Sequence, residues 1–321
     1  MTLYIITPVS PSGQLTKSPK KITGTADKLY EYYDLWEVID LKYAIIGGDR
    51  RSSLLAEALA ADGYTVHCFA LEKAEMSGCV NCVCLLSCLY GAECVILPIP
   101  AEKSGMINTP QSDRTLRTEE LTACLNSGQR LVGGGFGREF VFAAKASGVK
   151  ITDLLKDEGF AAYNASLTAE AAVGMLICES DTALAGSRVL VLGYGRIGRE
   201  LAKRLALLGA EVTVAARGAA ARTEAERAGI SAVTIEALDD ITERFDFIVN
   251  TVPARILSNT ALCGAAESAL LMELASAPGG FDGELARNIG LKTLFASGLP
   301  GKFSPRSSAQ YIKRYITSHG L

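Results

Sequence analysis

Apolar and polar positions along residues 42–164 follow the pattern of strands that alternate with helices. Short apolar runs such as KYAIIGG at 42–48 and ECVILPIP at 93–100 predict buried strands. The segment 52–63, SSLLAEALAADG, has apolar residues at a spacing of about 3.6 and a glycine stop, which predicts an amphipathic helix. Further strands are predicted at 64–71, 129–135 and 160–164, and further helices at 117–128 and 138–148. This alternation indicates a parallel, doubly wound sheet.

The same alternation returns after a helix predicted over 166–180, SLTAEAAVGMLICES. Ser166 can cap this helix, and Glu170 lies in its predicted first turn. Six strands follow, separated mostly by helices, at 187–193, 211–217, 231–235, 245–253, 269–278 and 291–300. We therefore expect an α/β fold with two doubly wound parallel-sheet domains, a flavodoxin-like N-terminal lobe and a Rossmann lobe, joined by a bridging helix.

Four segments describe the expected organisation of the chain. Residues 1–40 contain several prolines, a polar stretch and an aromatic cluster around Trp36. We interpret this segment as an N-terminal arm. The N-terminal α/β domain is expected over 41–165 and the Rossmann domain over 166–303. A last helix over 304–321 is expected to pack back on the N-terminal domain.

Composition and charge narrow the class of protein. Of 321 residues, 49% are apolar and 21% charged, which is ordinary globular composition. The formal net charge is −3, so no basic footprint for nucleic acid is present. No basic region precedes the short apolar stretch near Met1, so we expect no secretion signal. No run of eighteen uncharged apolar residues occurs, so we expect no membrane span.

Five of the nine cysteines lie close together in the sequence: Cys79, Cys82, Cys84, Cys88 and Cys94. The first two form a CxxC pair, which is compatible with a metal or iron–sulfur site. A second CxxC, which would make a zinc site convincing, is missing. We therefore expect reduced cysteines and no metal.

The most specific motif is the glycine pattern of Gly193, Gly195 and Gly198, which gives G-x-G-x-x-G between a predicted strand and a predicted helix. In this context the first glycine permits a tight turn, and the second lets the backbone approach a pyrophosphate. The third lets helix and strand pack closely. The free N–H groups at the helix N-terminus favour phosphate. The sequence therefore predicts a site for a nicotinamide dinucleotide.

The cofactor is expected to be NADP(H) rather than NAD(H). Where NAD sites carry an acidic residue, after the second strand, this chain has Arg217, and a guanidinium can pair with a 2′-phosphate. Strand ends that follow should also line the site. The expected cofactor-binding residues are Gly193, Tyr194, Gly195, Arg196, Ile197, Gly198, Arg217, Thr251, Val252, Pro253, Ser276 and Gly298.

Several segments together resemble the family of the dipicolinate synthase A subunit. They include the bridging helix with the glycine motif, DFIVNTVPARIL, ELASAPGGFD and LFASGLPGKFSP, and the resemblance covers roughly residues 42–320. It implies that the chain acts with a flavoprotein B subunit to oxidise dihydrodipicolinate to dipicolinate, in the mother-cell cytoplasm of a spore-forming bacterium. Glu273 departs from the family pattern, which has an aspartate there.

A substrate with two carboxylates calls for cations and N–H donors. The expected substrate-binding residues are Arg50, Arg51, Asn164, Ser166, Thr168 and Lys302, of which Ser166 and Thr168 sit at the predicted helix N-terminus. The alternative is that these two only cap the helix and that the arginines are solvated. No proton acceptor is evident; Glu170 is the one weak candidate for a catalytic residue.

Two other functions stay open. D-2-hydroxyacid dehydrogenases share the two-lobe layout but need a histidine acid/base, and neither His67 nor His319 fits that role. A non-catalytic NADP(H)-binding protein that serves as a scaffold for a flavoprotein is the other alternative. The expected partners are a small dicarboxylate and the flavoprotein, with a homo-oligomer left open and no nucleic acid.

Overall fold

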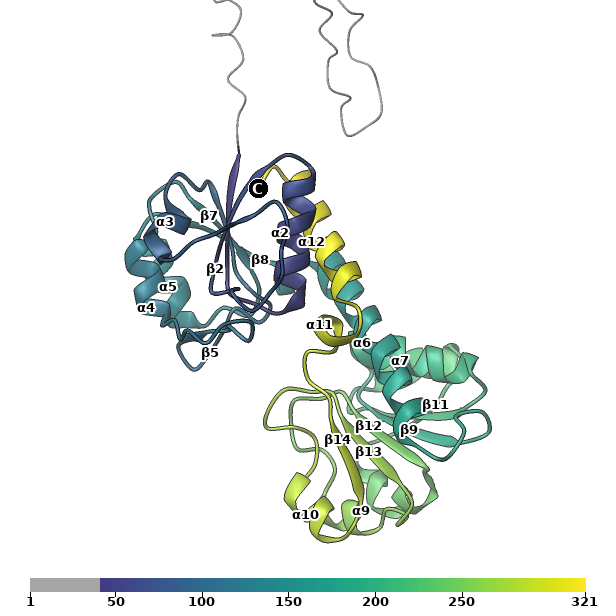
Figure 1. The fold of residues 1–321 in the computed structure, drawn as a ribbon. Helices are drawn as coiled ribbons and strands as arrows, with labels where there is room; N and C mark the ends of the chain where they lie inside the picture. The colour runs from purple at the N-terminus through teal and green to yellow at the C-terminus, as the bar shows by residue number, and fades with distance from the viewer. Residues whose placement is uncertain (1–40) are drawn as a thin grey trace, which may run out of the picture. The chain divides into compact units, whose positions relative to one another are not determined.

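The computed structural model describes residues 41–321, so the predicted arm and Trp36 lie outside the described residues. Two six-stranded sheets, each entirely parallel, account for most strands (Figure 1). The predicted fold class, two doubly wound parallel-sheet domains, is confirmed. Residues 42–321 form one compact unit by their contacts, and the predicted boundary at residue 165 stays a prediction.

The first sheet has the strand order β3-β2-β1-β4-β7-β8. Its strands are β1 (Lys42–Ile46), β2 (Thr65–Phe69), β3 (Val80–Asn81), β4 (Cys94–Ile96), β7 (Arg130–Gly133) and β8 (Lys150–Asp153). The five longer strands have the flavodoxin-like order. The two-residue β3 adds an edge strand that was too short to be predicted from periodicity.

Helices cover both faces of the first sheet because alternate strand residues point to opposite faces. Ala44 and Ile46 of β1 join a core formed with α3 (Leu85–Leu89), α4 (Thr118–Cys124) and α5 (Arg138–Ala146). The other face carries α2 (Arg50–Ala61) (Figure 1). A small antiparallel pair, β5 (Glu102–Lys103) and β6 (Met106–Ile107), precedes α4.

The second sheet has the order β11-β10-β9-β12-β13-β14, which is the Rossmann order 3-2-1-4-5-6. Its strands are β9 (Arg188–Leu192), β10 (Glu211–Ala215), β11 (Ser231–Val233), β12 (Phe247–Asn250), β13 (Leu270–Glu273) and β14 (Lys292–Phe295). One face packs on α7 (Arg196–Leu207) and α8 (Ala219–Arg227). The other face packs on the 3₁₀ helix η2 (Glu236–Asp240), α9 (Asn259–Cys263) and α10 (Gly283–Asn288). Two further 3₁₀ helices are η1 (Leu154–Lys156) and η3 (Thr242–Arg244).

The bridging helix α6 (Glu158–Glu179) begins eight residues earlier than predicted. Its N-cap is Asp157, whose Oδ1 accepts a hydrogen bond of 2.7 Å from the backbone N–H of Phe160. The predicted strand at 160–164 is therefore wrong, and so is the predicted capping role of Ser166. A short apolar run such as FAAYN fits a strand or a buried helix equally well by periodicity, and the upstream aspartate decides between them.

Among residues 41–321, α6 is the one helix with the length and composition of a membrane span: 22 residues with a mean hydropathy of 1.2. Of that apolar stretch, 44% is buried inside the protein. Its C-terminal half packs against α7 and the second sheet through residues such as Ala172 and Leu176. Contacts of this kind are those of a core helix.

The C-terminal segment forms α11 (Leu299–Phe303) and α12 (Pro305–Ser318). Figure 1 shows α12 beside α2, and the Lys313 ammonium donates to the carbonyl of Ala58 at 3.0 Å and pairs with Asp62. The ring of Tyr311 stacks on Tyr163 of α6, with 4.4 Å between the ring centres. The last helix thus contacts both α2 and the first half of α6.

Candidate dinucleotide-binding site

The turn between β9 and α7 has a backbone that favours glycine at its first position. Gly193 has φ +96°, in the left-handed region. A Cβ at Gly193 would lie 2.5 Å from Val252 Cγ2 and 2.7 Å from Thr251 Oγ1. The chain after β12 therefore packs directly against this turn, as the Rossmann order requires, and the structure brings Gly193, Thr251 and Val252 together.

The other two glycines keep a cradle open at the start of α7. Gly195 is the N-cap, no side chain caps the helix, and a Cβ at this position would point into open space. A Cβ at Gly198 would lie 2.2 Å from the carbonyl oxygen of Gly193, so only glycine allows this close packing. Free N–H groups beside open space are the surroundings that a pyrophosphate needs, so these residues fit a dinucleotide.

The side chains of the predicted neighbours mainly support the turn. Tyr194 is buried, and the Arg199 guanidinium lies 5.6 Å from the centre of its ring. Arg196 pairs with Glu158 of α6 at 2.5 Å. Ile197 is half-buried and packs on the core that α6 shares with the second sheet. The side chains of Tyr194 and Ile197 thus pack against the protein.

Two arginines stand at the carboxyl end of β10. Arg217 is exposed. Arg222, in α8, was missed by the sequence analysis; its Nη1 donates to the carbonyls of Ala216 and Arg217, at 2.7 Å each. The sequence feature that could have identified Arg222 is its position, five residues after Arg217 and in the first turns of a helix whose N-cap, Gly218, has no side-chain cap. The end of β10 is therefore basic and carries no acidic residue.

Two buried polar residues lie behind the next strand ends. Asn250 and Glu273 end the neighbouring strands β12 and β13, where they are Cα partners. Asn250 Nδ2 donates to Glu273 Oε1 at 2.6 Å. Ser276 and Gly298, predicted to contact the cofactor, are exposed in the turns after β13 and β14, and Gly298 is the left-handed N-cap of α11.

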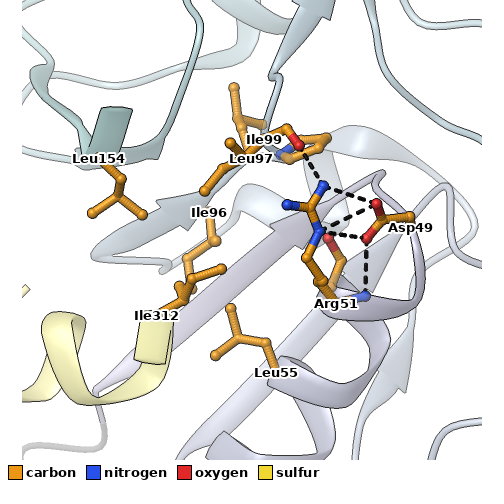
Figure 2. Close-up of a pocket in the computed structure, with 10 residues that line it drawn as sticks. Asp49, Arg51, Leu55, Ile96, Leu97, Ile99, Leu154 and Ile312 are labelled. Atoms are coloured by element: carbon orange, nitrogen blue, oxygen red, sulfur yellow. Dashed lines mark hydrogen bonds and ion pairs between the residues drawn. The ribbon is translucent and has the colours of Figure 1, made fainter. Parts of the chain in front are cut away.

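The first sheet has its own glycine turn, but the protein's side chains fill it. Arg51 is buried against Asp49, with Nη2 2.8 Å from Oδ2 and Nε 2.9 Å from Oδ1, and its Nη2 also donates to the carbonyl of Ile99 (Figure 2). Asp49 Oδ1 accepts from the backbone N–H of Arg51 as the N-cap of α2. Arg51 thus supports the fold, and of the predicted arginine pair only Arg50 is exposed.

The predicted anion site at Ser166 and Thr168 is not at a helix N-terminus. Ser166 Oγ accepts from Arg204 Nη2 of α7 at 2.8 Å. Thr168 is buried and donates to the carbonyl of Asn164 one turn earlier, at 2.8 Å. The N-terminal assignment is therefore wrong because the helix starts at Glu158. Asn164 is half-buried, whereas Glu170 of the same helix and Lys302 of α11 are exposed.

Cys79 and Cys82 flank the edge strand β3 of the first sheet. Cys84 and Cys88 belong to the start and body of α3, and Cys94 lies in the inner strand β4. All nine cysteines are free thiols, and Cys82 Sγ lies 3.6 Å from His67 Nδ1. A hydrogen bond between Cys68 and Cys79 raises the pKa of the Cys68 thiol and lowers that of Cys79. Within residues 41–321, no three His, Cys, Asp or Glu side chains come together as a metal site.

Comparisons with known proteins agree with this geometry. Residues 42–155 match the family model of the N-terminal domain of the dipicolinate synthase A subunit. Residues 162–272 match that of the D-isomer specific 2-hydroxyacid dehydrogenase, NAD binding domain. The second lobe is thus an NAD-binding domain of a dehydrogenase family, which indicates an oxidoreductase.

Whole-chain relatives point to one family. The dipicolinate synthase A subunit of Bacillus subtilis (strain 168) is 28% identical over 282 residues, which are 86% of this chain and 95% of the relative. The crystal structure of dipicolinate synthase, A chain, from Bacillus subtilis covers 87% of this chain and 95% of its own, with 28% identity and a TM-score of 0.75. The structure of the dipicolinate synthase A subunit from Bacillus halodurans has a TM-score of 0.77 at 24% identity, with 87% and 97% covered, and supports the fold. Over most of its length the chain is therefore similar to dipicolinate synthase A subunits, in sequence and in structure.

Proposed function

We propose that this protein is an NADP(H)-linked oxidoreductase that oxidises dihydrodipicolinate to dipicolinate. The observation that carries the proposal is the open glycine cradle at Gly193–Gly198 beside a basic strand end at Arg217. The first feature fits a pyrophosphate and the second fits a 2′-phosphate. The substrate is taken from the name of the relatives that this chain resembles.

The preference for NADP(H) rests on the two arginines at the end of β10. Arg217 is exposed, and Arg222 holds the backbone carbonyls of Ala216 and Arg217. A phosphate on the adenosine ribose would meet Arg217 beside the uncapped start of α8. NADH lacks that phosphate and gains nothing from either guanidinium.

The proposed oxidation of dihydrodipicolinate requires little acid/base catalysis by protein side chains. When bound, a nicotinamide accepts the hydride that leaves the dihydropyridine ring, and the ring gains aromaticity on losing a proton. The chain binds and orients the dinucleotide through its glycine turn. The exposed cations Arg50 and Lys302, with the half-buried Asn164, are the candidates for holding the substrate carboxylates.

Partner and place in the cell follow from the same resemblance. A flavoprotein B subunit is the proposed partner, and the mother-cell cytoplasm of a sporulating bacterium is the proposed location. Association with further copies of the chain stays compatible with this proposal.

Cofactor binding tests the first part. We expect NADPH to bind about ten-fold or more tightly than NADH, since a charge-assisted phosphate contact contributes about 1.5–3 kcal/mol. Arg217→Ala should weaken the binding of NADPH by a similar factor and leave the affinity for NADH unchanged. Calorimetric titration measures both affinities. Arg227→Ala, an exposed arginine at the other end of α8, is the matched control. Equal affinity for both cofactors in the unaltered chain would refute the preference.

Turnover tests the second part. Purified chain with dihydrodipicolinate and NADP should form dipicolinate, followed by absorbance, and addition of the flavoprotein should raise the rate. Activity that appears only with the flavoprotein, without reduction of NADP, would favour a scaffold instead.

The 2-hydroxyacid dehydrogenase alternative has the match over residues 162–272 in its favour. The chain has only two histidines. His67 lies in β2 beside Cys82, and His319 ends α12 with its ring stacked on Tyr315. Neither is placed on the second sheet. If the purified chain reduced NAD or NADP with 2-hydroxy acids as substrates, that result would support the dehydrogenase alternative.

A further inference from the structure

A buried carboxylate joins the two turns that follow β12 and β13. Glu273 is 6% exposed and Asn250 is fully buried. Glu273 Oε1 accepts from Asn250 Nδ2 at 2.6 Å and from the backbone N–H of Ala275 at 2.8 Å. Glu273 Oε2 accepts from the backbone N–H of Gly280 at 2.7 Å. Three N–H donors, one from the end of β12 and two from the turn after β13, thus converge on one carboxylate.

Further hydrogen bonds of Asn250 and Gly280 fix the chain on both sides of Pro253. Asn250 Nδ2 donates to the carbonyl of Val252 at 2.8 Å, and Asn250 Oδ1 accepts from the Val252 N–H at 3.1 Å. Farther along, the carbonyl of Gly280 accepts from the N–H groups of Ile256 and Leu257, at 3.0 and 2.9 Å. The loop after β12 is therefore held at both ends, and each end leads back to Glu273.

Close packing leaves this arrangement little freedom. A Cβ at Gly280 would lie 2.3 Å from Asn250 Cγ, and a Cβ at Gly279 would lie 2.8 Å from Glu273 Oε2. Both glycines thus allow the turn after β13 to close over the two polar side chains. The result is one rigid surface made from two turns.

That surface lies on one side of the second sheet's switch point. By the strand order of this sheet, a dinucleotide would cross between β9 and β12. Its adenosine half would lie on the β10 side, where Arg217 stands, and its nicotinamide half would lie over the ends of β12 and β13. The turns that Glu273 joins would therefore be those beside the nicotinamide.

We propose that Glu273 is a positioning residue, which holds Asn250 and both turns as the support for the nicotinamide half of the cofactor. The inference rests on the proposed dinucleotide-binding function. It assigns Glu273 no direct contact with the cofactor, since its oxygens already accept from protein donors.

The test separates the two halves of the cofactor. The probes are NADPH, titrated by nicotinamide fluorescence, and 2′,5′-ADP, which carries only the adenosine half, titrated by calorimetry. Glu273→Gln keeps the shape but turns an NH₂ group toward a backbone or side-chain donor. Gly280→Ala keeps the carboxylate and displaces the Asn250 amide instead. Glu267→Gln, an exposed carboxylate just before β13, is the matched control.

We expect both variants to bind NADPH about ten-fold or more weakly, with less fluorescence enhancement, and 2′,5′-ADP with unchanged affinity. Retained 2′,5′-ADP binding shows that the domain is folded. Equal losses for both ligands, or no loss for NADPH, would overturn the inference. If the unaltered chain bound neither NADPH nor 2′,5′-ADP, the proposed function would be refuted together with the inference. If the unaltered chain and the variants bound both ligands with the same affinities, only the positioning role of Glu273 would be refuted.

Discussion

The turn after β1 and the turn after β9 lie at the same topological position in their sheets. The helices that follow them, α2 and α7, differ in how their N-termini are capped. After β1, Asp49 caps α2 with its own carboxylate and pairs with the buried Arg51. After β9, Gly195 leaves the start of α7 without a side-chain cap and with open space around it. One helix N-terminus thus holds an internal anion, and the other is free for an external one.

This difference shows that strand order alone does not decide where a ligand binds. Both sheets direct a helix N-terminus to their carboxyl edge, where α/β folds bind ligands. The residue at the N-cap then decides the outcome: an aspartate satisfies the free N–H groups itself, whereas a glycine leaves them to a phosphate. The helix α6, capped by Asp157, belongs with the first kind.

The largest expected effect comes from removing the internal anion. Asp49→Ala should lower the free energy of unfolding by about 3–5 kcal/mol, because it leaves Arg51 buried without its partner. NADPH affinity should not change. Urea unfolding measures the first quantity and titration the second. Asp62→Ala, which removes a partly exposed ion pair with Lys313, is the control and should cost less than about 1 kcal/mol.

Transferring the aspartate to the second turn should have the next largest effect. Gly195→Asp places a carboxylate where the pyrophosphate would bind, and should weaken NADPH about 100-fold, which is about 2.7 kcal/mol. Stability should stay equal or rise by a few tenths of a kcal/mol, since aspartate caps slightly better than glycine. Gly195→Asn supplies the same shape without charge and should lose less. Undiminished binding by the aspartate variant would show that the phosphates lie elsewhere.

A smaller effect is expected at Ser166, which tests whether α6 offers an anion site. Ser166→Ala removes the acceptor of Arg204 and should cost about 1 kcal/mol in unfolding free energy. The KM for dihydrodipicolinate should not move. Glu170→Gln, an exposed position one turn on, should change stability by less than about 0.5 kcal/mol. A raised KM in the serine variant would return Ser166 to the substrate site.

The smallest expected difference concerns thiols, which the first sheet carries after its edge strand β3 and in its inner strand β4, whereas the strands of the second sheet have none. Hydrogen bonding with the side chain and backbone of Ser87 lowers the pKa of the exposed Cys84, whereas burial raises the pKa of Cys94 to about 12. Because the thiolate is the reactive form, alkylation of Cys84 should begin at lower pH than for an ordinary thiol, and Cys94 should stay unlabelled at neutral pH. Mass spectrometry after iodoacetamide treatment measures this order, and unfolding in urea should abolish it.

The sequence alone supported the fold class and the glycine cradle, because each position of G-x-G-x-x-G is required by local backbone geometry. The strand predicted at 160–164 failed because four apolar or aromatic residues in a row carry no period that separates strand from helix. Asp49 was readable as a cap but was overlooked beside two arginines. Asn250 and Glu273 lie 23 residues apart, and only the pairing of β12 with β13 brings them together.

The bare amide hydrogens at the start of α7 carry a practical consequence for work in solution. Any small oxyanion in the buffer, such as sulfate or inorganic phosphate, will compete for them and mask weak cofactor binding. Crystals grown from ammonium sulfate would then hold the precipitant where the pyrophosphate belongs. Titrations in a bulky organic buffer at low ionic strength therefore give the truest affinity.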